Sequence, residues 1–168
     1  AMRPMNVELY EGDLNEVVRG VLEFVQYELQ TSDIELEFDP TESLPKIELD
    51  EKYLKQALMN IVKNAIAAMP EGGRLVVSTE RANDEIRLRI ADTGLGMSQD
   101  VAEKIFEPYF TTKDYGSGIG LTLVYKVIKE HMGDVYVETE EGSGTSFTLT
   151  FPIPQREQRL LSFRGEDA

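Results

Sequence analysis

The chain contains no cysteine, no tryptophan and only one histidine among its 168 residues. The missing cysteines exclude disulfide bonds and thiolate metal sites, and they are compatible with a reducing compartment. No apolar run reaches the roughly 18 to 20 residues that a membrane-spanning helix needs. The opening "AMRPMNVELY" has no signal-peptide core, so we expect a cytoplasmic location without membrane contact.

Basic residues are also scarce. The chain has 17 Lys and Arg against 31 Asp and Glu, which gives a formal net charge of −14. A nucleic-acid partner needs a basic face to meet its phosphates, so this balance argues against such a partner. A phosphate-bearing ligand would have to be bound locally, by backbone N–H groups, a metal ion or a few lysines.

The residues that are present have the composition of one globular domain, with 41% apolar and 29% charged residues. Helical periodicity predicts helices over 13–30, 50–69 and 119–131, with Asp13 and Asp50 as caps of the first two. Alternation predicts strands at 7–12, 33–39, 46–49, 74–80 and 85–92, and a hairpin over 133–154. We therefore expect an α+β fold, a two-layer sandwich in which helices cover one face of a mixed, mostly antiparallel sheet.

Residues 93–117 have no regular pattern and are too many for an ordinary connection, which indicates either a functional lid or an element that the pattern fails to show. We expect one domain over 1–154 with this lid at about 98–117. The tail 155–168 is expected to be loosely ordered, or to link to another domain.

The predicted helix 50–69 carries two asparagines, Asn60 and Asn64, one turn apart. They fall beside Ala67 and Ala68, opposite an apolar stripe formed by Leu54, Leu58, Ile61, Val62, Ala65, Ile66 and Met69. One interpretation is a solvated polar face, although such faces usually carry Glu and Lys at this spacing. The other is a pair of carboxamides whose oxygens ligate a hard cation. The helical wheel leaves both open.

Two glycine motifs follow. "ADTGLGM" ends a predicted strand in Asp92, which either starts a tight turn or accepts a hydrogen bond from the exocyclic amine of adenine. "DYGSGIG" places alternating glycines before a helix, where exposed N–H groups suit phosphates, although a plain loop explains the pattern as well. The second motif is neither a Walker A loop nor a good Rossmann fingerprint.

In chain order, the sequence has an Asn-x-x-x-Asn helix, an Asp-x-Gly-x-Gly strand end, the aromatic segment "IFEPYFTTK" and a glycine-rich loop. This combination, over roughly residues 7–153, resembles the ATP-binding catalytic domain of sensor histidine kinases. Their superfamily also holds gyrase-type topoisomerases, heat-shock chaperones and mismatch-repair ATPases. "GSGTSFTLTFP" matches the family's closing hairpin, and "NAIAAMPEGG" with "FEPYFTTK" looks most like nitrogen-regulation-type sensor kinases.

The resemblance implies that the domain binds ATP and Mg²⁺ and transfers the γ-phosphate to a histidine. Asn64 would ligate the magnesium ion, Asn60 would stand beside the phosphates, and both would be catalytic. Asp92 would read adenine. The implied nucleotide-binding residues are Asn60, Lys63, Asn64, Asp92, Gly94, Gly96, Met97, Lys113, Gly116, Ser117, Gly118, Ile119, Gly120, Leu121 and Thr145.

Within this set, Gly94 and Gly96 would shape the adenine pocket and Thr145 would close it. The phosphate-covering end of the lid would be formed by Gly116, Gly118, Gly120 and Leu121. Anchoring of the lid to the core is expected from Phe106, Tyr109 and Phe110. Lys113 is either a phosphate contact or an exposed lid lysine, and Lys63 points partly away on the wheel, so the lysine that neutralises the γ-phosphate stays open.

Hydrolytic members of the superfamily carry a glutamate at the position of Asn60, where it acts as general base. An amide cannot take a proton, so Asn60 favours phosphoryl transfer, in which catalysis is mostly positioning and charge neutralisation. The rival functions are a related serine kinase or chaperone-type ATPase, which expect the carboxylate, and a non-catalytic nucleotide-binding module, which the intact motifs disfavour.

The single histidine, His131, lies at a predicted helix end before Gly133. There it would gain from the helix dipole and cap the turn, which is a structural role. The resemblance places the phosphoacceptor histidine upstream, on a dimerisation hairpin that this chain is expected to lack. The expected partners are that hairpin of the same kinase and a downstream response regulator.

Overall fold

The computed structural model describes residues 5–106 and 118–155. The helices and strands follow the predicted order, with one short addition, α3. Their bounds are β1 Tyr10–Gly12, α1 Leu14–Thr31, β2 Ile34–Asp39, β3 Ile47–Leu49, α2 Glu51–Ala67, β4 Gly73–Ala82, β5 Glu85–Asp92, α3 Gln99–Lys104, α4 Gly118–Glu130, β6 Val135–Glu140 and β7 Gly144–Pro152.

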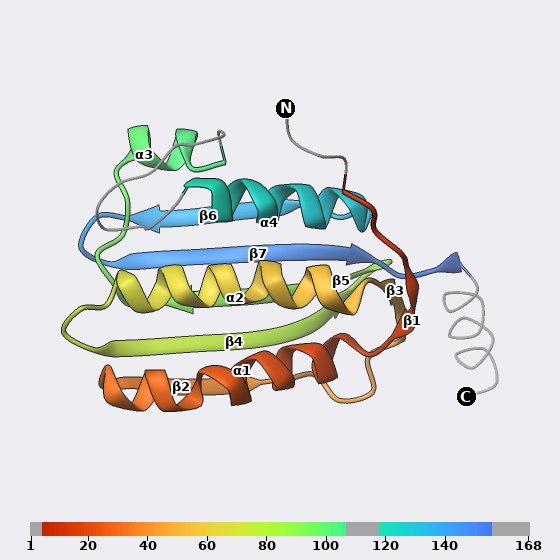
Figure 1. The fold of residues 1–168 in the computed structure, drawn as a ribbon, viewed down its shortest axis with the longest axis horizontal. Coiled ribbons are helices and arrows are strands. Elements are labelled where there is room, and N and C mark those ends of the chain that lie inside the picture. Colours follow the sequence, from red (N-terminus) through yellow and green to blue (C-terminus); the bar gives the residue numbers. More distant parts are fainter. Residues whose placement is uncertain (1–4, 107–117, 156–168) are drawn as a thin grey trace.

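The strands form a five-stranded sheet in the order β2-β4-β5-β7-β6, and β1 pairs with β3 in a separate two-stranded sheet. Strand β2 is parallel to β4, and every other pair of the larger sheet is antiparallel. Helices α1, α2 and α4 lie side by side over one face of this sheet (Figure 1). The predicted two-layer α+β sandwich with a mixed, mostly antiparallel sheet is confirmed.

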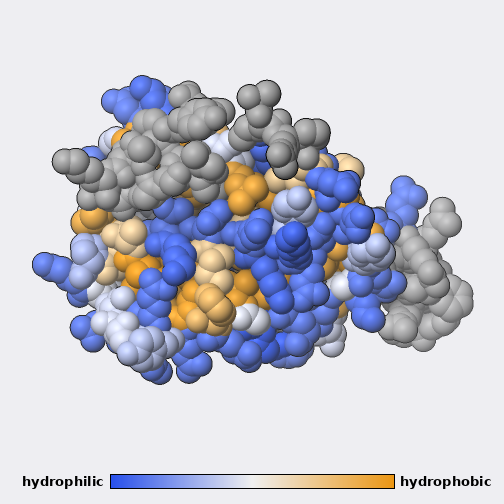
Figure 2. Space-filling model, in the orientation of Figure 1, coloured by the Kyte–Doolittle hydropathy of each residue, from blue (hydrophilic) through white to orange (hydrophobic). Residues whose placement is uncertain are grey.

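Alternation along the strands decides which face the helices cover. Leu88 of β5 and Leu149 of β7 are fully buried on the helix side, whereas Arg89 and Thr148, the next position along each strand, face the open side. From the helix side the surface is mostly hydrophilic, with apolar side chains visible between the charged ones (Figure 2). Burial of one sheet face against amphipathic helices therefore supplies the core.

Three details differ from the sequence prediction. The expected edge strand 7–12 is shorter and belongs to the small β1-β3 sheet instead of the main sheet. The helix α3 lies inside the stretch predicted to be irregular, because Ser98 caps it by accepting from the backbone N–H of Val101. Ala68 was placed on the polar side of its helix but is buried, because the chain bends at the helix end and packs the loop after β5 on it.

The predicted lid and tail are covered only in part. Residues 98–106 of the expected lid belong to the described residues, and 107–117 lie outside them. Of the tail, only Gln155 is described. The boundaries of the domain, lid and tail therefore stay predictions.

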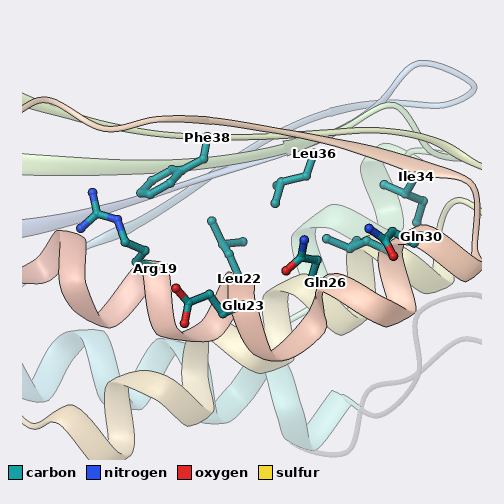
Figure 3. Close-up of a pocket in the computed structure, with 9 residues that line it drawn as sticks. Arg19, Leu22, Glu23, Gln26, Gln30, Ile34, Leu36 and Phe38 are labelled. Atoms are coloured by element: carbon teal, nitrogen blue, oxygen red, sulfur yellow. The ribbon is translucent and has the colours of Figure 1, made fainter.

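A groove of about 380 Å³ lies between α1 and the edge strand β2. Ile34, Leu36 and Phe38 point from β2 toward α1, and Leu22 points back toward them (Figure 3). Polar side chains such as Gln26 line the rim. The groove contains none of the residues that the motifs single out.

His131 joins the C-terminal end of α4 to the N-terminal end of α2. Its Nδ1 lies 2.7 Å from the carbonyl oxygen of Val127, and its Nε2 accepts the backbone N–H of Asp50 at 2.9 Å. The carboxylate of Asp50 caps α2 at Tyr53 and also accepts the N–H of Glu8. A carbonyl can only accept, so the proton sits on Nδ1 and the ring is neutral.

These contacts confirm a structural role for His131 but correct its reason. A gain from the helix dipole was expected, whereas the ring is buried, and this burial is the main cause that lowers the pKa of His131. The hydrogen bond to Val127 and the charges of Asp50 and Glu130 raise the pKa by less. A proton on Nε2 would point at the backbone N–H of Asp50 and break the hydrogen bond between them, so protonation of His131 destabilises the folded state.

We expect the free energy of unfolding to fall as the pH drops below 6.5, the ordinary pKa of histidine, because the unfolded chain then takes up a proton that the folded chain resists. Above pH 6.5 the neutral His131 makes its full contribution to the free energy of unfolding. That contribution is lost as the pH falls from 6.5 to the lowered pKa of His131 in the folded chain. His131→Gln should remove this acid dependence and cost about 1–3 kcal/mol at neutral pH. Urea unfolding between pH 5 and 8 measures both. An unchanged pH slope in the variant would refute the assignment.

Candidate functional site

The carboxylate of Asp92 stands at the end of β5 and is held by backbone donors from two segments. The N–H of Gly94 donates to its Oδ1 at 2.9 Å, and the N–H of Thr145 donates to the same atom at 3.2 Å. Its Oδ2 accepts no hydrogen bond from the described residues. Burial raises the pKa of Asp92, and the two N–H groups lower it by less. A partly desolvated carboxylate with one unused oxygen is a strong acceptor for a ligand donor.

The loop after Asp92 is clamped between the end of α2 and the turn joining β6 to β7. Leu95 donates its N–H to the carbonyl of Ala68 at 2.9 Å, and its own carbonyl accepts the N–H of Gly142. A Cβ at Gly94 would lie 2.3 Å from that Ala68 oxygen. A Cβ at Gly96 would lie 1.9 Å from a carbonyl oxygen of the turn. Only glycine allows these approaches, so the motif is required for the backbone to reach its place.

The side-chain amide of Asn64 on α2 is bonded through its nitrogen and keeps its oxygen available. Asn64 donates its Nδ2 to the carbonyl of Asn60 at 2.7 Å, which identifies the nitrogen end of the amide. The Oδ1 of Asn64 accepts no hydrogen bond from the described residues. Both residues are half-buried. The helix thus presents one amide oxygen of Asn64, a ligand type that Mg²⁺ accepts.

Asn64 and Asp92 meet at one small cavity. The cavity is lined by Asn64, Ala65, Ala68, Asp92, Met97, Leu121, Thr145 and Phe147. Its volume of about 10 Å³ is room for about one water, so a purine ring can enter only if wall side chains move. Met97 is the most adaptable of these walls, because methionine is unbranched.

The structure therefore brings together five of the predicted site residues, which come from four separate segments: Asn64, Asp92, Met97, Leu121 and Thr145. Gly94 and Gly96 shape the loop beside them. Gly118, Ile119 and Gly120 form the first turn of α4. The predicted residues Tyr109, Phe110, Lys113, Gly116 and Ser117 lie outside the described residues.

Three predicted residues lie elsewhere. Asn60, one turn before Asn64 on α2, is not among the residues that line the cavity. Lys63 is exposed on α2 and pairs with Glu28 of α1 at 3.0 Å, so it does not line the cavity. Phe106 contacts the core as expected of a lid anchor: its ring lies 5.8 Å from that of Tyr125, and its carbonyl accepts the hydroxyl of Thr122.

Sequence reasoning missed Ala65, Phe147 and Thr139. Ala65 was expected only as a core residue and Phe147 only as part of the closing hairpin, and both also line the cavity. Thr139 donates and accepts hydrogen bonds beside Met97 and Thr145. An isolated threonine in an alternating strand carries no sequence signal of such a role.

A metal ion has few protein ligands here. Among the described residues, no group of three or more His, Cys, Asp or Glu side chains could hold one. The donor set fits a Mg²⁺ ion that is bound by the amide oxygen of Asn64 together with the phosphates of a nucleotide.

The family model for histidine kinase-, DNA gyrase B- and HSP90-like ATPases matches residues 49–155. This span contains the asparagine helix, Asp92 with its glycine loop, and the closing hairpin. The chain belongs to this ATPase family.

Sensor histidine kinases are among its relatives. It is 34% identical over 154 residues to sporulation kinase E of Bacillus subtilis, covering 91% of this chain and 21% of that kinase. It is 34% identical over 152 residues to the sensor histidine kinase ZraS of Escherichia coli, covering 90% of this chain and 33% of ZraS. The chain thus spans about a fifth to a third of the curated relatives.

Solved structures agree. The catalytic domain of the histidine kinase ThkA superposes with a TM-score of 0.79 at 33% identity, covering 88% of this chain and 99% of that domain. ThkA in complex with the response regulator protein TrrA matches with a TM-score of 0.76 at 29% identity, covering 90% of this chain and 43% of ThkA. The chain is therefore an ATP-binding catalytic domain of the histidine kinase type.

Among residues 5–106 and 118–155, no helix is long and apolar enough to cross a membrane.

We expect Gly96→Ala to displace the loop after β5 that lines the cavity, because the new Cβ would meet the carbonyl of Glu140 at 1.9 Å. Gly142→Ala is the matched control. Both glycines have positive φ, +70° and +80°, but a Cβ at Gly142 meets nothing within 4 Å. Both variants should lose about 1–2 kcal/mol to left-handed backbone, and Gly96→Ala should lose more and also bind ATP poorly. Urea unfolding measures the loss of stability, and calorimetry measures the loss of ATP affinity. Equal losses in Gly96→Ala and Gly142→Ala would show that the contact between a Cβ at position 96 and the Glu140 carbonyl has no effect.

Proposed function

We propose that this kinase domain binds Mg²⁺–ATP and transfers its γ-phosphate to a histidine on the dimerisation and phosphoacceptor hairpin of the same kinase. The observation that carries the proposal is the carboxylate of Asp92. Its Oδ1 is fixed by the N–H groups of Gly94 and Thr145, and its Oδ2 is left for a ligand donor. Adenine offers an amine, whereas guanine offers a carbonyl oxygen at the same position, so the carboxylate selects ATP.

Asn64 supports the metal part of the proposal. Its amide oxygen would ligate the Mg²⁺ that bridges the phosphates and neutralises their charge. The nucleotide phosphates would then lie near the first turn of α4, where the backbone N–H groups of a helix start, those of Gly118 and Gly120 among them, would suit anions. A chain of net charge −14 binds a triphosphate through such local donors.

Asn60 decides which reaction follows binding. An amide cannot accept a proton from water, so the site has no general base at the position where hydrolytic relatives carry glutamate. A neutral imidazole nitrogen needs no base to attack. In the transfer, the bond between the γ-phosphorus and the β–γ bridging oxygen breaks, a phosphorus–nitrogen bond forms, and ADP leaves.

The acceptor histidine comes from outside this chain. The only histidine of the 168 residues is His131, which is 2% exposed and hydrogen-bonded through both nitrogens. No phosphate donor can reach it in the folded domain. The hairpin, and downstream a response regulator such as ThkA contacts, are therefore the proposed partners.

We also propose a finer assignment, a nitrogen-regulation-type sensor kinase that works in the cytoplasm. The wording "NAIAAMPEGG" and "FEPYFTTK" supports the subtype. The proposed lid extends from Ser98, the cap of α3, to Ser117, and the proposed tail follows residue 154. A lid of this length would close over the triphosphate, and Lys113 within it is the proposed phosphate contact.

We expect Asn64→Ala to lose most of the affinity that Mg²⁺ adds to ATP binding, because the variant removes the amide oxygen that ligates the metal. Calorimetry with Mg²⁺ and with EDTA measures that gain. Gln56→Ala, an exposed change two turns earlier on α2, should keep it. If Asn64→Ala keeps the magnesium gain but unfolds at lower temperature, the asparagine is structural and the metal assignment fails.

We expect the domain alone to hold ATP with very slow turnover and without labelling itself. Addition of the phosphoacceptor hairpin as a separate chain should yield a phosphate on the hairpin that is acid-labile and base-stable, as phosphohistidine is. Asp92→Asn should abolish the transfer by weakening ATP binding. Rapid phosphate release by the domain alone, or stoichiometric labelling of His131, would overturn the proposed function.

A further inference from the structure

The hydroxyl of Thr139, at the end of β6, has three polar neighbours. It accepts the backbone N–H of Met97 at 2.9 Å. It donates to the carbonyl oxygen of Gly144 at 3.1 Å. Its Oγ1 also lies 2.9 Å from the Oγ1 of Thr145, where either hydroxyl could be the donor on distance alone.

Counting protons removes that ambiguity. A hydroxyl has one proton to donate and two lone pairs that accept. The carbonyl of Gly144 only accepts, so the Thr139 proton is used there. If that proton pointed to Thr145 instead, the lone pairs of the Thr139 Oγ1 and of the Gly144 carbonyl oxygen would face each other at 3.1 Å. The arrangement that satisfies all three contacts at once therefore has the Thr145 hydroxyl donating to Thr139, whose two lone pairs are then filled by Met97 and Thr145.

This arrangement fixes the polarity of Thr145 toward the cavity. Thr145 is buried, lines the cavity beside Asp92, and has spent its only hydroxyl proton on Thr139. Its Oγ1 can then only accept. With the unused Oδ2 of Asp92, the cavity presents two acceptors and no side-chain hydroxyl donor from Thr145.

We propose that Thr139 is a positioning residue that sets the base specificity of this kinase domain by holding Thr145 as an acceptor. The inference rests on the proposed function, in which Asp92 meets the base. Two acceptors suit the amine of adenine, or a water that donates to both Thr145 and the adenine N1. They oppose hypoxanthine, the base of ITP, whose carbonyl oxygen replaces that amine.

Thr139→Val tests the proposal, because valine keeps the shape of threonine and removes the hydroxyl. The freed Thr145 hydroxyl can then donate to the carbonyl of hypoxanthine while Asp92 accepts its N1–H. The ratio of the ITP and ATP dissociation constants should fall about tenfold, the effect of one typical hydrogen bond. Calorimetry on the whole chain with each nucleotide and Mg²⁺ measures this ratio.

Two controls separate positioning from structural support. Thr139→Ser keeps a hydroxyl and should keep the wild-type ratio. Thr148→Val, the same change on the open face of β7, should also keep it. If Thr139→Val weakens ATP and ITP by equal factors, Thr139 is only structural and this inference is wrong, whereas the proposed function stands. If the wild type shows no preference and Asp92→Asn changes neither affinity, the proposed function itself has failed.

A second measurement uses the wild-type chain, so that it holds even if Thr139→Val does not fold. The buried hydroxyl proton of Thr145 should be visible by NMR and show its nearest contact to Thr139, with and without bound ADP. A Thr145 hydroxyl proton that contacts the bound base instead would overturn the inference.

Discussion

The Oδ1 atom of Asp92 accepts backbone N–H groups from two places far apart in the sequence, Gly94 and Thr145. Burying a carboxylate is costly unless hydrogen bonds compensate, so these two donors are required if the charge is to stand at the end of β5. They can reach it only because the loop after β5 lies directly on its neighbours. A Cβ at Gly144 would lie 2.1 Å from the carbonyl oxygen of Asp92. Glycines are needed at Gly94, Gly96 and Gly144 because backbone N–H groups must come close enough to hydrogen-bond the charged carboxylate of Asp92.

The rest of the domain holds this end of the sheet against the helices. The neutral ring of His131 fastens the far end of α4 to the start of α2. Since α4 begins with Gly118 and α2 carries Asn64, this contact fixes the relative position of the proposed phosphate donors and the proposed metal ligand from the opposite end. A hydrogen-bond network of the buried side chains of Asn15 and Thr79 with the backbone of Thr41 similarly joins α1 to β4. Polar groups that are fully paired in this way specify one packing of the layers.

Function depends on which hydrogen-bond roles remain after folding. Asn64 uses its nitrogen within the helix and keeps its oxygen. Asp92 uses one oxygen and keeps the other. In the proposed arrangement Thr145 uses its proton on Thr139 and keeps its lone pairs. In each case an intramolecular hydrogen bond occupies one donor or acceptor of the side chain and leaves an oxygen that can accept. Such oxygens suit a ligand that brings an amine and a metal ion.

The sequence by itself determined the fold class and the motifs, because amphipathic periods, the caps Asp13 and Asp50, and the glycines act locally. It also placed Asn64, Asp92, Leu121 and Thr145 in one site through the family resemblance. Only the tertiary structure decided that Ala68 is buried under the loop, that Lys63 turns to Glu28, that His131 is neutral, and that Thr139 lies against Thr145. Each of these depends on a partner from another element, and the geometry of such a contact is set by the packing of the layers, which no local pattern encodes.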